Sequence, residues 1–137
     1  MSKRIVVLGS TGSIGRQALQ VVDEDPGSYR VIALAAGSNI GLLAEQVKKY
    51  RPLYVSVGTT QAADQLKRMI PGLKIEIMAG TEGLLNLAGL PGVDLILVAV
   101  TGINGLRPTL AALENKITVA LANKETLVTA GPLVMKK

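Results

Sequence analysis

The stretch KRIVVLGSTGSIGRQALQVV (residues 3–22) joins an apolar run of strand length to a segment with helical periodicity. Between them lie Gly9, Gly12 and Gly15, three residues apart. Such a strand, glycine turn and helix can hold a pyrophosphate, because glycines let the backbone approach the anion and the helix presents free N–H groups to it. The spacing matches the usual G-x-G-x-x-G fingerprint only loosely, so a purely structural turn stays an alternative.

The rest of the chain repeats the strand-helix unit. Strands are predicted over 4–10, 30–36, 53–57, 74–79, 93–100 and 117–122. Helices are predicted over 13–24, 41–50, 60–70, 81–89 and 105–115, with another beginning within 124–137. Six such units predict an α/β fold, a Rossmann-type doubly wound parallel sheet in a three-layer αβα arrangement. The almost wholly apolar run 93–100 is expected at the centre of the sheet, and 74–79 near its edge.

Composition excludes several kinds of chemistry. The chain has no Cys and no His, so it offers no thiolate nucleophile, no disulfide and no imidazole base or ligand. Its carboxylates are scattered, and no metal-ligand cluster is predicted. The net charge is +5, but the basic residues come singly or in pairs with no aromatic residues between them. Nucleic-acid binding is therefore not expected, and attraction for small anions fits better.

No membrane association is predicted either. The longest apolar runs are far shorter than the ~20 residues that span a bilayer. The N-terminus passes from MSKR directly into a strand, with no signal or transit segment. The expected location is the cytoplasm.

The loop after the second predicted strand bears on the choice of cofactor. NAD-specific folds carry a carboxylate there for the adenosine ribose. In this chain no Asp or Glu occurs between Asp25 and Glu45, and the loop has the neutral residues Gly37, Ser38 and Asn39. A 2′-phosphate would not be repelled, which favours NADP. The alternative is an ordinary loop in which Asn39 caps the next helix.

The stretch ANKET (122–126) follows the sixth predicted strand. Asn123 and Glu125 could hold the cofactor and Lys124 an anionic or oxygen-rich substrate. Equally, Asn123 could cap the final helix while Glu125 favours its positive end. The spacing alone leaves both interpretations open.

Together, LGSTGSIGRQALQVV, ALAAGSN, GLRPTLAAL and ALANKETLVTAG resemble the 1-deoxy-D-xylulose 5-phosphate reductoisomerase family, from residue 4 to the end of the chain. The resemblance implies an NADPH-dependent enzyme of isoprenoid biosynthesis. Such an enzyme rearranges its sugar phosphate substrate and reduces the resulting aldehyde to 2-C-methyl-D-erythritol 4-phosphate. It also implies a divalent metal, Mg²⁺ or Mn²⁺, and a homodimer.

The resemblance also assigns residues. Those matching the family's cofactor contacts are Thr11, Gly12, Ser13 and Ile14 at the pyrophosphate turn, Gly37, Ser38 and Asn39 at the adenosine-phosphate loop, and Asn123 and Glu125. Lys124 matches a substrate contact. Many family members have Lys or Arg at the position of Ser38, which leaves the strength of the 2′-phosphate contact open.

The family's metal-binding DSE carboxylates, catalytic-domain His residues and lid lie beyond residue 137. The resemblance therefore implies that residues 1–137 are the NADP(H)-binding domain alone, with no catalytic residue, no metal ligand and no activity by itself.

Three other functions remain alternatives. A semialdehyde dehydrogenase has a similar glycine turn but uses a Cys nucleophile, which this chain lacks. A short-chain reductase or sugar-nucleotide epimerase needs Tyr-x-x-x-Lys, and none of the three tyrosines has Lys four residues later. A non-enzymatic NADP sensor would bind the dinucleotide and report to a partner.

Overall fold

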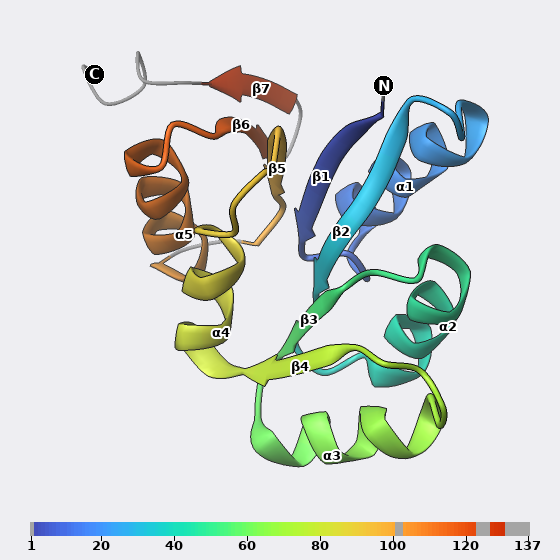
Figure 1. Ribbon diagram of the computed structural model, residues 1–137. Coiled ribbons are helices and arrows are strands. Elements are labelled where there is room, and N and C mark those ends of the chain that lie inside the picture. The colour runs from blue at the N-terminus through green and yellow to red at the C-terminus, as the bar shows by residue number, and fades with distance from the viewer. Residues whose placement is uncertain (1, 101–102, 123–126, 131–137) are drawn as a thin grey trace.

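A twisted sheet forms the centre of the computed structural model, which describes residues 2–100, 103–122 and 127–130 (Figure 1). In these residues the sheet has the order β4-β3-β2-β1-β5-β6-β7, and all pairs from β4 to β6 are parallel. The parallel strands are β1 (Lys3–Leu8), β2 (Tyr29–Ala35), β3 (Tyr54–Val57), β4 (Glu76–Ala79), β5 (Leu95–Val98) and β6 (Thr118–Ala122). The predicted doubly wound sheet is confirmed, with β5 inside it and β4 at one edge.

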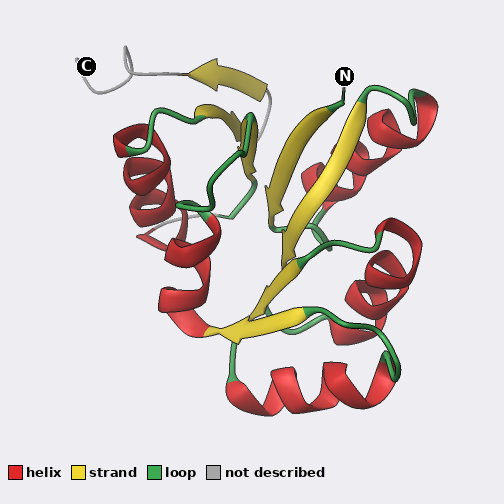
Figure 2. Ribbon diagram, viewed as in Figure 1, coloured by secondary structure: helices red, strands yellow, loops and turns green. Residues whose placement is uncertain are grey.

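Helices cover both faces of the sheet, giving three layers (Figure 2). One face packs against α1 (Ser13–Glu24), α2 (Ile40–Tyr50) and α3 (Thr60–Met69). The opposite face packs against α4 (Gly80–Leu87) and α5 (Ile103–Glu114). The chain changes face between β4 and β5, and this change brings β5 beside β1 on the side opposite β2.

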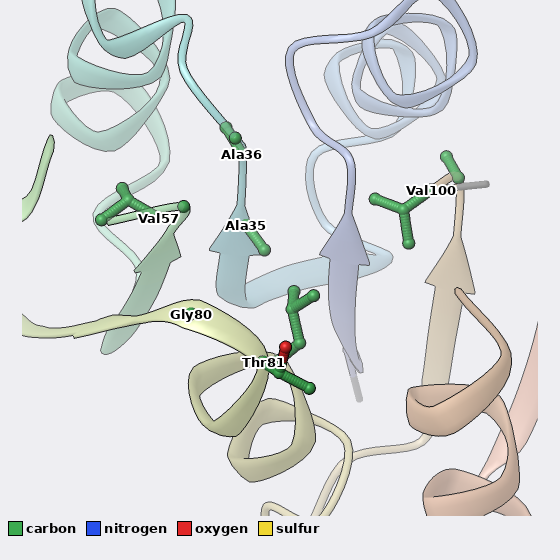
Figure 3. Close-up of a pocket in the computed structure, with 10 residues that line it drawn as sticks. Ala35, Ala36, Val57, Gly80, Thr81 and Val100 are labelled. Carbon is green, nitrogen blue, oxygen red and sulfur yellow. The ribbon is translucent and has the colours of Figure 1, made fainter. Parts of the chain in front are cut away.

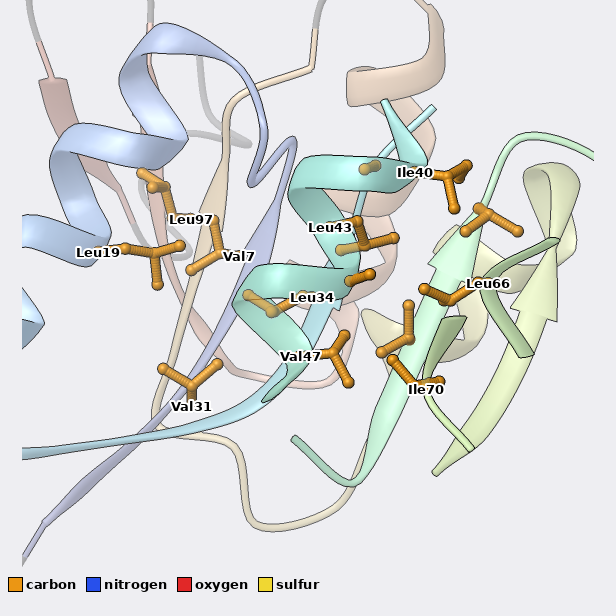
Figure 4. Close-up of a cluster of buried hydrophobic side chains, with 14 of the residues drawn as sticks. Val7, Leu19, Val31, Leu34, Ile40, Leu43, Val47, Leu66, Ile70 and Leu97 are labelled. Atoms are coloured by element: carbon orange, nitrogen blue, oxygen red, sulfur yellow. The ribbon is translucent and has the colours of Figure 1, made fainter. Parts of the chain in front are cut away.

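Each sheet face has its own apolar core. Figure 4 shows the first, in which Leu19 of α1, Leu43 of α2 and Leu66 of α3 pack against the strands. Each is 3% exposed or less, and burying a leucine side chain stabilises the fold by about 1.5–3 kcal/mol. With almost no aromatic residues available, these aliphatic side chains and their counterparts on the other face make up the core.

Successive side chains of β2 point to opposite faces of the sheet, and this alternation is interrupted once. Ile5 pairs with Val31 and Val6 with Ala33, so Ile32 is an extra residue opposite β1. Ile32 and Ala33 consequently both belong to the core beneath α4 and α5. Such a bulge shifts the register of the residues after it, including those that lead to the carboxyl end of β2.

The helix predicted to begin within 124–137 is not found in the described residues. Leu127–Ala130 instead forms β7, which pairs antiparallel with β6 from Val119↔Ala130 to Ala122↔Leu127. The segment LVTA is too short for its periodicity to distinguish helix from strand, and pairing with the edge of β6 decides between them. Residues 131–137 lie outside the described part of the chain.

Candidate dinucleotide-binding site

The turn after β1 lies between the carboxyl ends of β2 and β5. The backbone N–H groups of Gly9 and Ser10 donate to the carbonyl of Ala35, at 2.8 and 2.9 Å, and so attach the turn to the end of β2. On the other side, the Ala99 N–H donates to the Leu8 carbonyl at 2.8 Å. Chain connections diverge to opposite faces of the sheet here, and open α/β sheets bind their ligands at this kind of crevice.

Two of the three glycines in the turn are required by the fold. Gly9 has a φ of +91°, and a Cβ on it would lie 2.8 Å from the Ala99 carbonyl oxygen. A Cβ on Gly15 would overlap the carbonyl oxygen of Gly9. Gly9 therefore permits the tight turn against β5, and Gly15 permits α1 to start directly on the end of β1.

Gly12 differs from both. A Cβ on it would meet only the Gly9 carbonyl oxygen, at 3.6 Å, which is an ordinary contact. Its φ of −79° is accessible to any residue, and it is exposed. Packing within the described chain therefore does not require a glycine here, and the open space above Gly12 is available to a ligand.

Free backbone donors surround Gly12. The first amide bond of α1 runs from Arg16 to the Gly12 carbonyl at 3.0 Å. Among the described residues, the N–H groups of Thr11, Ser13, Ile14 and Gly15 have no acceptor (Gly15 being buried and the others half-buried or exposed). The first turn of α1 carries no acidic residue, so its positive end is not neutralised. This arrangement suits an anion such as a phosphate.

The loop after β2 adds neutral polar groups beside the turn. Gly37, Ser38 and Asn39 are all exposed. The Asn39 Oδ1 accepts a hydrogen bond from the Leu42 N–H at 3.3 Å, so Asn39 does cap α2. Its Nδ2 group and the Ser38 hydroxyl have no partner among the described residues, which leaves both free to donate to a ligand.

A cavity of about 510 Å³ opens beside this loop (Figure 3). It lies between the ends of β2, β3 and β5 and the start of α4, and its lining is small and uncharged: Ala35, Ala36, Gly37, Val57, Gly58, Gly80, Thr81, Leu84, Ala99 and Val100. Walls of this kind suit a flat, largely apolar ring. No pattern in the sequence singles out Gly58, Gly80 or Thr81, although each lies within two residues of a strand end.

Three residues singled out in the sequence, Asn123, Lys124 and Glu125, lie outside the described residues. The structure describes β6 up to Ala122, and β6 neighbours β5.

In the part of the chain that the structure covers, no group of three or more Asp or Glu residues could hold a metal ion. Among the described helices, none combines the length and the apolar composition of a membrane-spanning segment.

The shifted pKa values lie at the far ends of α1 and α2, away from this turn. Lys49 forms an ion pair with Asp23 at 2.7 Å and lowers the pKa of that carboxyl. The Tyr50 hydroxyl donates to Asp23 Oδ1 at 2.8 Å. Burial, together with that hydrogen bond, raises the pKa of Tyr50. This cluster joins the two helices and takes no part in the candidate site.

Comparison with known proteins gives one consistent result. A family model described as 1-deoxy-D-xylulose 5-phosphate reductoisomerase matches residues 5–131. The protein of that name from Heliobacterium modesticaldum is 53% identical over 98% of this chain, which spans 35% of that relative.

Solved structures agree. The reductoisomerase from Zymomonas mobilis in complex with NADPH superposes with a TM-score of 0.84 at 36% identity, over 91% of this chain and 33% of that one. A reductoisomerase in complex with NADPH, fosmidomycin and magnesium gives 0.82 at 32% identity, over 90% and 30%. In each case this chain spans about a third of the length of the protein that it matches.

Proposed function

Because this chain belongs to the 1-deoxy-D-xylulose 5-phosphate reductoisomerase family, we propose that residues 1–137 are the NADPH-binding domain of such an enzyme. Family membership excludes the alternative functions of a semialdehyde dehydrogenase and of a short-chain reductase. The observation that carries the proposal is the set of unpartnered amides around Gly12, at a position where the fold itself does not need a glycine. A pyrophosphate accounts for both features.

The proposed cofactor contacts follow the geometry of the turn and loop. The free amides of Thr11, Ser13 and Ile14 surround the pyrophosphate beside Gly12, which leaves open space for it, and the hydroxyls of Thr11 and Ser13 add donors. Gly37, Ser38 and Asn39 receive the adenosine 2′-phosphate. The absence of a carboxylate in that loop removes the repulsion that would otherwise select NADH.

The adenine ring enters the cavity beside Gly37, whose small uncharged walls match a flat ring. When bound, NADPH supplies a hydride. The role of this chain is to bind the cofactor and orient it at the carboxyl edge of the sheet. Asn123 and Glu125, which follow β6 in the sequence, are proposed as further cofactor contacts, and Lys124 as a substrate contact.

For the whole protein we propose conversion of 1-deoxy-D-xylulose 5-phosphate to 2-C-methyl-D-erythritol 4-phosphate in isoprenoid biosynthesis. The Mg²⁺ or Mn²⁺ ligands and the catalytic residues belong to sequence outside this chain. The parent protein is proposed to be a cytoplasmic homodimer. The family membership of this chain supports the proposed reaction.

A pair of thermal-shift titrations tests the cofactor assignment. A ligand that binds only the folded state stabilises it by ~2.7 kcal/mol at 100 times its dissociation constant. We expect a larger shift with NADPH than with NADH, because only NADPH carries the 2′-phosphate. An equal or larger shift with NADH, or no shift with either, would contradict the proposal. If this chain alone catalysed the reductoisomerase reaction, the proposal that it is inactive by itself would be wrong.

A further inference from the structure

A buried glutamine from α2 contacts the backbone of the glycine turn. The Gln46 side chain is 7% exposed, and its Nε2 donates to the carbonyl oxygen of Ser10 at 2.8 Å. Ser10 is itself fully buried. The two residues are 36 positions apart, so this hydrogen bond ties the turn after β1 to a helix that begins after β2.

The contact controls the orientation of one peptide group. The described backbone contains no cis peptide bond, so the Thr11 N–H points opposite to the Ser10 carbonyl within the same peptide plane. Gln46 holds that carbonyl toward the protein interior. The Thr11 N–H is thereby directed to the open side of the turn, where Gly12 and Ser13 are exposed and where it has no acceptor among the described residues.

We propose that Gln46 is a positioning residue of the cofactor site, which holds the Ser10–Thr11 peptide with its N–H toward the pyrophosphate. The inference rests on the proposed function. A reversed peptide would present the Ser10 carbonyl oxygen to the anion and replace an attraction with a repulsion. Gln46 acts through the backbone of the turn, by its hydrogen bond to the Ser10 carbonyl.

The other end of the Gln46 side chain supports this role. Its Oε1 is buried and has no hydrogen-bond partner in the described residues. A buried acceptor without a partner destabilises the fold, and an apolar side chain of similar shape would avoid that cost. The useful group at this position is therefore the Nε2 donor, and its partner is the turn.

Hydrogen exchange of the ligand-free chain tests the contact. In Gln46→Met, which keeps the side-chain length and removes the donor, we expect the amides of Gly9, Ser10 and Gly12 to exchange at least tenfold faster than in the wild type. Amides inside β1, such as those of Val6 and Val7, should stay within twofold. Unchanged exchange rates in the turn would overturn the proposal. So would an equal acceleration of exchange in the turn and in β1, because general destabilisation acts on both.

Ligand binding tests whether the orientation of the Ser10–Thr11 peptide matters for holding the pyrophosphate. Gln46→Met should bind NADPH at least tenfold more weakly, while binding of adenosine 2′-monophosphate, which has no pyrophosphate, should change less than twofold. Gln20→Met is the matched control, because Gln20 is exposed on the same groove between α1 and α2 and has no hydrogen-bond partner in the described structure. It should leave both affinities within twofold.

The outcomes separate the two proposals. Equal losses for both ligands, or none for NADPH, would overturn the role of Gln46. A wild-type chain that does not bind NADPH would refute the proposed function, and the exchange measurement would still decide whether Gln46 holds the turn.

Discussion

The carbonyl oxygen of Gly9 lies so close to Gly15 that it would overlap a Cβ there, so α1 starts in direct contact with the end of β1. The same relationship recurs on the other face of the sheet, where a Cβ on Gly105 would overlap the Val100 carbonyl oxygen. In both units a helical glycine allows the helix to approach the end of the preceding strand. The approach places the amino end of α1 at the carboxyl edge of the sheet.

Gly15→Ala should destabilise the fold. The added methyl would require the start of α1 to move away from β1, and overpacking of this kind costs about 1–3 kcal/mol. Urea unfolding followed by circular dichroism measures the change. Gly41→Ala is the control, because a Cβ at Gly41 meets nothing within 4 Å and alanine favours the helix by up to about 1 kcal/mol. Equal stability of Gly15→Ala and the wild type would contradict the packing role.

Gly12→Ala should separate binding from stability. The methyl group would point into open space above the turn, so the free energy of unfolding should fall by no more than about 1 kcal/mol, the usual range for changing an N-cap residue. NADPH affinity should fall at least tenfold, because the methyl excludes the pyrophosphate. Isothermal titration of folded protein measures this, and an unchanged dissociation constant would place the phosphate elsewhere.

Ser38→Arg should strengthen the preference for NADPH. The loop 37–39 contains no cation, and a guanidinium there would add a charge-assisted hydrogen bond to the 2′-phosphate. NADPH should bind about tenfold more tightly at low salt, with NADH unchanged within twofold. Ser38→Asp is the paired variant and should weaken NADPH, because it adds a like charge. The assignment of this loop fails if neither substitution alters the NADPH to NADH ratio.

Tyr50 should make the fold less stable in alkali. Its pKa is raised in the folded state, so the unfolded chain loses this proton first, near the ordinary tyrosine pKa of about 10. Its contribution to stability is therefore complete below pH 10 and is lost as pH rises above it. The loss is at most about 1.4 kcal/mol per pH unit, and less with the screening of a partly exposed group.

Urea titrations of the wild type and Tyr50→Phe between pH 8 and 11 test this. The phenylalanine variant should be less stable at pH 8, by about 1 kcal/mol for the lost hydrogen bond to Asp23. The difference should shrink above pH 10. Parallel pH dependence of the two proteins would show that Tyr50 does not titrate differently on folding. Tyr54→Phe is the control, since Tyr54 makes no side-chain hydrogen bond in the described structure.

Much of the site was predictable because its parts follow strand ends. The turn at residues 9–14 and the loop at 37–39 were found from glycine spacing and from a missing carboxylate, which are local features. Their roles as cofactor contacts remain predictions. The cavity residues Gly58 and Gly80 were missed, because no local pattern shows that the residues after β3, β4 and β5 line one cavity.

The order of residues along the chain was sufficient for the alternation of strands and helices, and for α1 from Ser13 to Glu24. Periodicity and turn residues act over a few positions, so they can be recognised without knowing the fold. The antiparallel β7, the extra residue Ile32 in β2 and the hydrogen bond from Gln46 to Ser10 depend on pairing between segments far apart in the chain. The tertiary structure also distinguishes the roles of the three glycines in the turn. Packing requires a glycine at positions 9 and 15, whereas Gly12 is left open to a ligand.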